Sequence, residues 1–176
     1  MLRVIHHSSL PGTPRGKTAV EAIGLADIAS VEACVLVQSW KKWRGWHAMP
    51  PYSAWADSNL GPYIAYASVA RVLDGGSDYE LEFIGRAHIQ AYGVNHQGKL
   101  VSEIAQLSPQ FGRQLKASYD LVRISGNPHA FHGSIGPEHP SARFTWFETA
   151  YLPLREGATV SHILNAAMYK LRDIAA

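Results

Sequence analysis

The sequence predicts an α+β domain built around an antiparallel sheet. A helical pattern precedes two strand-like segments joined by a hairpin turn, a second helix begins near residue 108, and further strand-like segments follow it. The chain has 176 residues, of which 47% are hydrophobic and 17% charged. That composition is sufficient to bury the core of one domain without disulfides.

The first part of the chain predicts an arm and a helical flank. Residues 1–17 hold prolines and glycines among polar residues, which is typical of a flexible arm. Within the flank, residues 18–47, Thr18 and Glu21 have the spacing of a capping box and favour a short helix. Asp27 can cap a longer helix, in which apolar residues recur at helical spacing. These residues are Val31, Val35, Leu36, Trp40 and Trp43.

Residues 48–176 are predicted to form the core. Prolines make residues 48–62 a long loop. Two strands follow at about 66–73 and 79–85. The intervening Asp-Gly-Gly-Ser-Asp, residues 74–78, is a strong hairpin signal.

A helical region follows the hairpin. Residues 86–106 are interrupted by glycines and favour one-turn helices. Ser108 and Pro109 then mark a clear helix start, because serine is a good cap and proline suits the first helical position. This helix is predicted to close at Gly126.

The C-terminal part predicts strands. Residues 129–136 and 143–154 have strand composition, and Pro153 is expected to end the second strand. Residues 159–170 are ambiguous, because their apolar residues fit a helical face while their first half also fits a strand.

Charge and cysteine content limit the function classes. Sixteen Lys and Arg against fourteen Asp and Glu give a net charge of +2, which argues against a dedicated nucleic-acid-binding or polybasic membrane-binding domain. A single cysteine, Cys34, cannot form an intrachain disulfide. The sequence shows neither a signal-peptide pattern nor an apolar run long enough to span a bilayer. We therefore expect a cytoplasmic protein without membrane insertion.

No sequence pattern assembles a catalytic set, so we assign no catalytic residue and do not expect an enzyme. Cys34 lies mid-helix between apolar neighbours and favours a buried thiol. Glu148 is isolated in an apolar strand and favours a partner for a cation such as Arg86 or Arg143. The alternative is a small α+β enzyme that uses Glu148 or a histidine as its acid–base group.

Two further patterns have a functional and a structural interpretation. His129, His132 and His139 could converge on Zn²⁺, but residues three apart on a strand point to opposite faces, so we favour surface histidines and assign no metal. Residues 40–47 interleave aromatic and basic side chains, as single-stranded nucleic-acid platforms do. We favour a helix end with its tryptophans on the core, and no nucleic-acid partner.

Several ordered motifs together resemble the PAS-like domain family common in alphaproteobacteria. They are Trp40-x-x-Trp43-Arg44-Gly45, Met49-Pro50, Tyr79 to Gly85, Ala91-Tyr92-Gly93, Gly98 to Ile104, Gly126-Asn127-Pro128 and Glu148 to Leu154. Two positions depart from the family pattern. Glu82 stands where the family usually has arginine, and Arg86 stands where threonine is common.

The resemblance implies a five-stranded antiparallel sheet, a helical connection across one face and an N-terminal flanking helix. It favours a strand at residues 159–170. PAS domains act as sensors and interaction modules and often hold a small ligand between sheet and helices. The resemblance thus implies a stand-alone regulatory domain with a protein partner and no output segment. Its cofactor is unknown, with His88 or His96 left open as a haem ligand.

Two sets of candidate site residues follow. The expected lining of a ligand cavity is Phe83, Tyr92, Phe111, Tyr119 and Trp146. The expected homodimer seam on the N-terminal helix is Leu36, Trp40 and Trp43.

Overall fold

The computed structural model describes residues 18–137, 139 and 142–172. In these residues the strands are β1 Ala19–Ile23, β2 Ala67–Leu73, β3 Asp78–Ile84, β4 His129–Ser134, β5 Phe144–Glu156 and β6 Thr159–Leu171. The helices are α1 Val31–Arg44, α2 Tyr52–Ala56, α3 Arg86–Tyr92, α4 Val101–Leu107 and α5 Pro109–Ser125, with short 3-10 turns η1 Leu25–Asp27, η2 Gly61–Tyr66 and η3 Asp74–Gly76.

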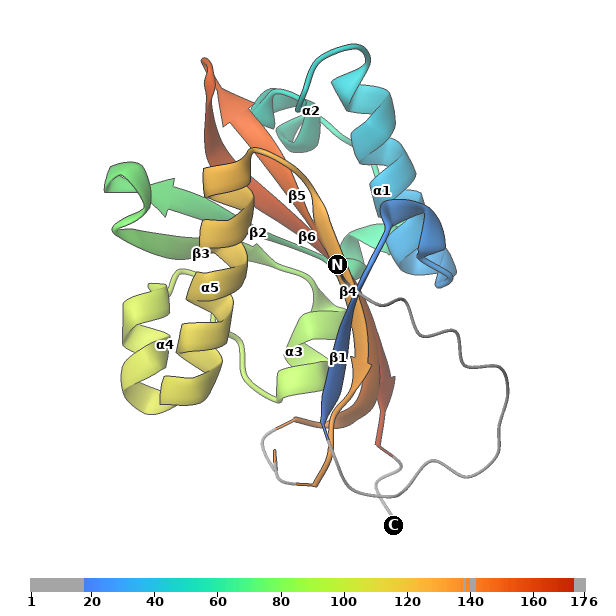
Figure 1. Cartoon of the computed structure of the whole chain (residues 1–176), viewed down its shortest axis with the longest axis vertical. Helices are drawn as coiled ribbons and strands as arrows, with labels where there is room; N and C mark the ends of the chain where they lie inside the picture. The colour runs from blue at the N-terminus through green and yellow to red at the C-terminus, as the bar shows by residue number, and fades with distance from the viewer. Residues whose placement is uncertain (1–17, 138, 140–141, 173–176) are drawn as a thin grey trace, which may run out of the picture.

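The strands form one open antiparallel sheet in the order β1-β4-β5-β6-β2-β3. Helices α1 and α2 lie on one face of this sheet, and α3, α4 and α5 lie on the other (Figure 1). The predicted α+β class is confirmed, as are the hairpin between β2 and β3 and the helix that begins at Pro109.

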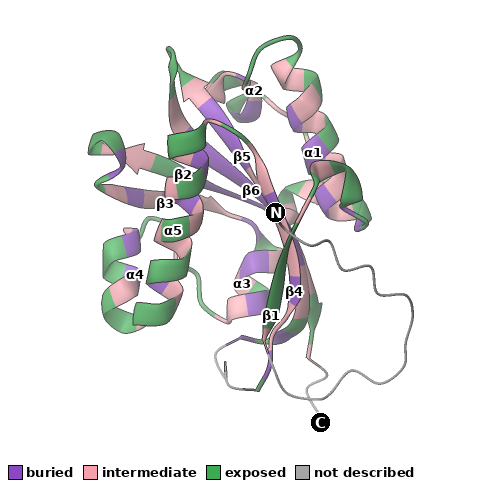
Figure 2. Ribbon diagram, viewed as in Figure 1, coloured by how far each residue is buried: buried purple, intermediate pink, exposed green. Residues whose placement is uncertain are grey.

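Each face of the sheet carries its own apolar core. Figure 2 shows that the central strands are rich in buried residues. Successive side chains of a strand point to opposite faces. Leu152 and Leu164 therefore pack with α1, whereas their neighbours Tyr151 and Ile163 pack toward α4 and α5. The long strands β5 and β6 contribute to both cores.

The predicted short helix at Thr18 is wrong, because residues 19–23 form the edge strand β1. This strand pairs with β4 from Ala19 opposite Ser134 to Ile23 opposite Ala130. The Thr18 hydroxyl accepts a hydrogen bond from the amide of Gly136 (3.1 Å) instead of capping a helix. Pairing with residues more than 100 positions away thus overrides the local capping signal. With β1 included, the described sheet has six strands, whereas five were expected.

The predicted strand end at Pro153 is also wrong, since β5 continues to Glu156. Pairing with β4 stops at Tyr151, so Pro153 lies beyond the last β4 pair, where its missing N–H costs no ladder bond on that side. On the other side it pairs with Ile163. Residues 159–171 form β6, so the strand alternative is correct for this segment.

None of the helices in the described residues has both the length and the apolar character of a membrane span.

Candidate functional site

A cavity of about 50 Å³ lies between the sheet and the helical layer of α3 and α5. Its walls draw on β2, β3, β5 and β6 as well as on the two helices. Its most polar wall residues are Ser68, His88, His96 and Asn165, and its tyrosines are Tyr92, Tyr119, Tyr151 and Tyr169.

The tyrosines make the cavity wall aromatic and uncharged. The Tyr92 ring lies 4.6 Å from Phe111 and 5.9 Å from Tyr169, and the Tyr119 ring lies 5.9 Å from Tyr151. Burial raises the pKa of all four phenols above the ordinary value of 10, so they remain neutral at neutral pH.

His88 is a buried and fully bonded imidazole. Its Nε2 donates to the carbonyl oxygen of Tyr66 (3.1 Å), and its Nδ1 accepts from the Tyr169 hydroxyl (3.0 Å). Burial lowers the pKa of His88 to about 4, against a smaller opposing effect of the Tyr66 hydrogen bond. A haem iron would have to displace one of these bonds.

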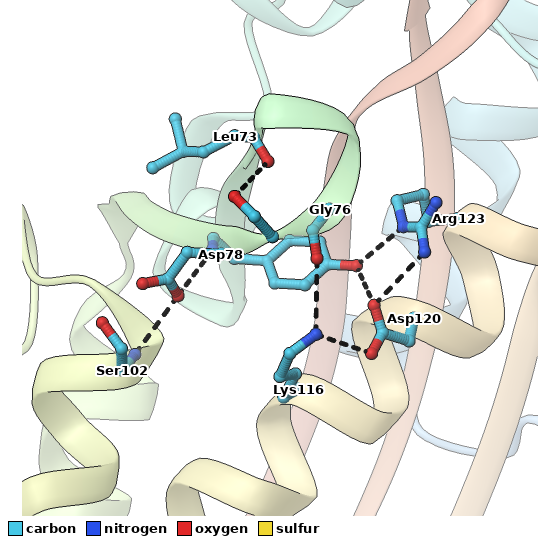
Figure 3. Close-up of polar contacts among 9 residues, drawn as sticks. Leu73, Gly76, Asp78, Ser102, Lys116, Asp120 and Arg123 are labelled. Atoms are coloured by element: carbon cyan, nitrogen blue, oxygen red, sulfur yellow. Dashed lines mark hydrogen bonds and ion pairs between the residues drawn. The ribbon is translucent and has the colours of Figure 1, made fainter.

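A polar network holds α5 against the hairpin beside the cavity (Figure 3). The Tyr79 hydroxyl donates to Asp120 (2.6 Å) and accepts from Arg123 Nε (3.1 Å). Lys116 donates to the other Asp120 oxygen (2.8 Å) and to the Gly76 carbonyl (3.3 Å). The network fixes two turns of α5 to the start of β3.

This network positions one wall of the cavity. Its Tyr79 ring lies 5.1 Å from the ring of Tyr119, which lines the cavity. Burial, followed by the hydrogen bond to Asp120, raises the pKa of Tyr79 to about 12. Tyr79 therefore stays a hydrogen-bond donor at neutral pH.

Three of the five expected lining residues, Tyr92, Phe111 and Tyr119, line this cavity. Phe83 lies on the opposite face, 5.6 Å from the ring of Trp55. A bulge between β2 and β3 explains this placement, because it inserts one extra residue after Leu81 and reverses the face of Phe83.

Trp146 also lies away from the cavity. Its ring lies 6.4 Å from the ring of His132. Ala130, two residues before His132 on the same face of β4, belongs to the α1 core. The pairing of β5 with β6 shifts register between Phe144 and Trp146, so Phe144 reaches Tyr92 while Trp146 does not. Irregular strand pairing thus separates two of the five residues from the site.

The expected seam residues of α1 face their own sheet. Leu36 and Trp40 are fully buried, and Trp43 packs partly buried against the same core. The outer side of α1 forms a shallow, mostly apolar surface that includes Val31, Cys34 and Val35. A homodimer stays a prediction, and on this geometry it would use the outer residues.

Glu148 is buried at the N-terminus of α1. Its carboxylate accepts hydrogen bonds from the amides of Ala29 (3.0 Å) and Ser30 (2.7 Å) and from the Ser30 hydroxyl (2.5 Å). A negative charge at this end also suits the helix dipole. Its partners are therefore helix-end donors, whereas an arginine was predicted, and both oxygens are committed to structure.

The remaining sequence candidates lie apart from the cavity. His129 bonds Ser125 (3.0 Å) and His132 faces Glu21 (3.3 Å), while no three His, Cys, Asp or Glu side chains in the described residues converge as metal ligands. In the segment 40–47, Trp40 is buried but Trp46 is fully exposed. The tryptophans thus divide between core and surface.

A cluster on the α2 side of the sheet was not predicted from the sequence. Tyr52 stacks on His162 (ring centroids 3.7 Å apart) and donates to Glu82 (2.6 Å), whose other oxygen lies 3.2 Å from His162 Nε2. Burial lowers the pKa of His162 despite the nearby Glu82 carboxylate. The sequence singled out Glu82 only as a departure from the PAS-like pattern. Leu81 faces α5, so the next residue, Glu82, points to the α2 side by ordinary strand alternation.

Comparison with protein-family models, curated proteins and solved structures gave no significant match. The PAS resemblance therefore stays a prediction.

Proposed function

We propose that this protein is a PAS-type regulatory domain that binds a small molecule in the cavity beneath α3 and α5 and acts through a protein partner. The cavity carries this proposal, because it combines aromatic walls with a few buried polar groups, as ligand sites do. Its place between the sheet and the connecting helices is where the resemblance expects a ligand.

The chain topology supports the same proposal. Strands β2 to β6 are contiguous in the sheet, and α3, α4 and α5 all lie between β3 and β4 in the chain and cover one face. Helix α1 flanks the other face. This is the arrangement that the resemblance implies, with β1 as an additional edge strand.

Helix α1 is the element best placed to carry a signal to a partner. Its N-cap residue Ser30 is bonded to Glu148, and Trp40 in its C-terminal half donates to the Pro153 carbonyl (2.8 Å). Tyr151, between these two attachments on β5, lines the cavity. Cavity and helix thus contact opposite faces of the same strand. We expect this action to take place in the cytoplasm.

Mass spectrometry of small molecules released from natively purified protein tests the proposal. The informative variant is Leu115→Trp, which enlarges a cavity-lining side chain on α5. Its matched control is Leu107→Trp, since Leu107 is exposed on α4. We expect the wild type and the control to release a molecule that Leu115→Trp lacks. Equal release from both variants, or none from the wild type, contradicts the proposal.

A further inference from the structure

The structure also indicates the class of ligand, an inference that rests on the proposed function. We infer that the cavity selects a small uncharged molecule, which bonds to Ser68, Tyr119 and Asn165 through both a donor and an acceptor.

Three nearly buried side chains that line the cavity carry polar atoms without a hydrogen-bond partner. Ser68, Tyr119 and Asn165 are 7%, 3% and 6% exposed. Within the described residues, nothing hydrogen-bonds to the two hydroxyls or to Asn165 Oδ1. The Asn165 amide is oriented by its Nδ2, which donates to Thr149 Oγ1 (2.5 Å) and to the Ala150 carbonyl (3.3 Å). None of these three atoms is among the fully enclosed unpaired side-chain atoms of the described residues, so each stays accessible and can bond to a small molecule in the cavity.

Most of the other polar groups of the cavity have partners, whereas no hydrogen bond of the His96 ring occurs within the described residues. The Tyr169 hydroxyl donates to His88, and Tyr92 bonds Tyr169. Tyr151 bonds Ser118 and Thr149. Among the cavity tyrosines Tyr119 is therefore the one whose hydroxyl has no partner in the described chain.

The lining offers no charge to balance a charged ligand. No Asp, Glu, Lys or Arg is among the described lining residues. Burial lowers the pKa of both lining histidines, and the nearby Lys99 lowers that of His96 further, so both are neutral at pH 7. An ion entering this cavity would lose its hydration without gaining a counter-charge.

The volume limits the size of the ligand. The cavity measures about 50 Å³, which suits a small molecule.

An isosteric series of probes tests the inference. Acetamide, acetate and acetamidinium share one planar shape and differ in charge. Each is titrated at pH 7.5 into the full-length chain, and amide chemical shifts of β6, α3 and α5 are recorded by NMR. We expect saturable shifts with acetamide and about tenfold weaker binding, or none, with the two ions.

The variant Tyr119→Phe removes the unused hydroxyl and keeps the ring. It should weaken acetamide binding roughly three- to tenfold, whereas Tyr63→Phe on η2, outside the cavity, should not. If an ion binds as tightly as acetamide, or if Tyr119→Phe binds acetamide with unchanged affinity, the inferred ligand class is wrong. The cavity is still a binding site in either case. No saturable shift with any probe also overturns it, and the released-molecule experiment then decides separately whether the proposed function stands.

Discussion

Acid should destabilise this fold through His88. The imidazole is buried and neutral, with a pKa of about 4 in the folded state against about 6.5 when exposed. Unfolding therefore takes up a proton below pH 6.5, so the stability contributed by His88 is complete above that pH. It falls as the pH drops from 6.5 to 4 and levels off below.

The size of the effect follows from these two pKa values. Each pH unit within this window changes the free energy of unfolding by up to about 1.4 kcal/mol, which gives about 2 kcal/mol between pH 7 and 4.5. His88→Gln provides the comparison, because its amide can still donate toward the Tyr66 carbonyl but takes up no proton. At pH 7 we expect this variant to be less stable than the wild type by about 1–2 kcal/mol, from the altered contact with Tyr169.

The assay is urea denaturation of both proteins between pH 7.5 and 4.5. All other titrating groups are common to the two chains, so the difference between the curves isolates His88. The wild-type advantage should shrink by about 2 kcal/mol, so that it is lost or reversed by pH 4.5. Parallel curves would refute the assignment of His88 as a buried neutral group.

Three more substitutions test separate parts of the fold. Glu148→Gln should lower the free energy of unfolding by about 2–4 kcal/mol in urea denaturation, because an amide cannot accept all the bonds at the α1 N-terminus. The control Glu21→Gln, at an exposed site, should cost about 0.5 kcal/mol or less. Equal losses in the two variants would contradict the role of Glu148 at the α1 N-terminus. Gly133→Ala would place a Cβ 2.2 Å from the Ala19 carbonyl, so hydrogen exchange should quicken in β1 and stay slow in β6; unchanged protection of β1 would count against this pairing. Trp46→Ala should leave thermal stability within about 0.5 kcal/mol, since Trp46 is fully exposed, and a loss above about 1 kcal/mol would show that it packs.

Local signals predicted part of this fold well. The hairpin sequence at residues 74–78 and the Ser108-Pro109 helix start act within a few residues, and both elements form where expected. The segment after Thr18 shows the limit of such signals. Its capping pattern was real, but pairing with β4 is worth more than one short helix, and that partner lies far along the chain.

The site was less predictable than the fold. Aromatic composition indicates that a residue is buried but not which face of the sheet it reaches. The bulge after Leu81 and the register shift before Trp146 decide that for Phe83 and Trp146, and neither leaves a local sequence signal. The unpaired atoms of Ser68, Tyr119 and Asn165 come together only through the sheet and α5. Sequence spacing does not encode such convergence.

Two hydrogen-bonded attachments join α1 to β5, so the distance between them along the strand must match the distance along the helix. From Ser30 to Trp40 the helix rises about 15 Å, and from Glu148 to Pro153 the strand extends about 17 Å. These spans match, so α1 can hold both bonds while running alongside β5. One residue inserted between Glu148 and Pro153 would lengthen the strand by about 3.3 Å and turn one attachment to the wrong face. The count of residues in this stretch of β5 is therefore as constrained as their chemistry.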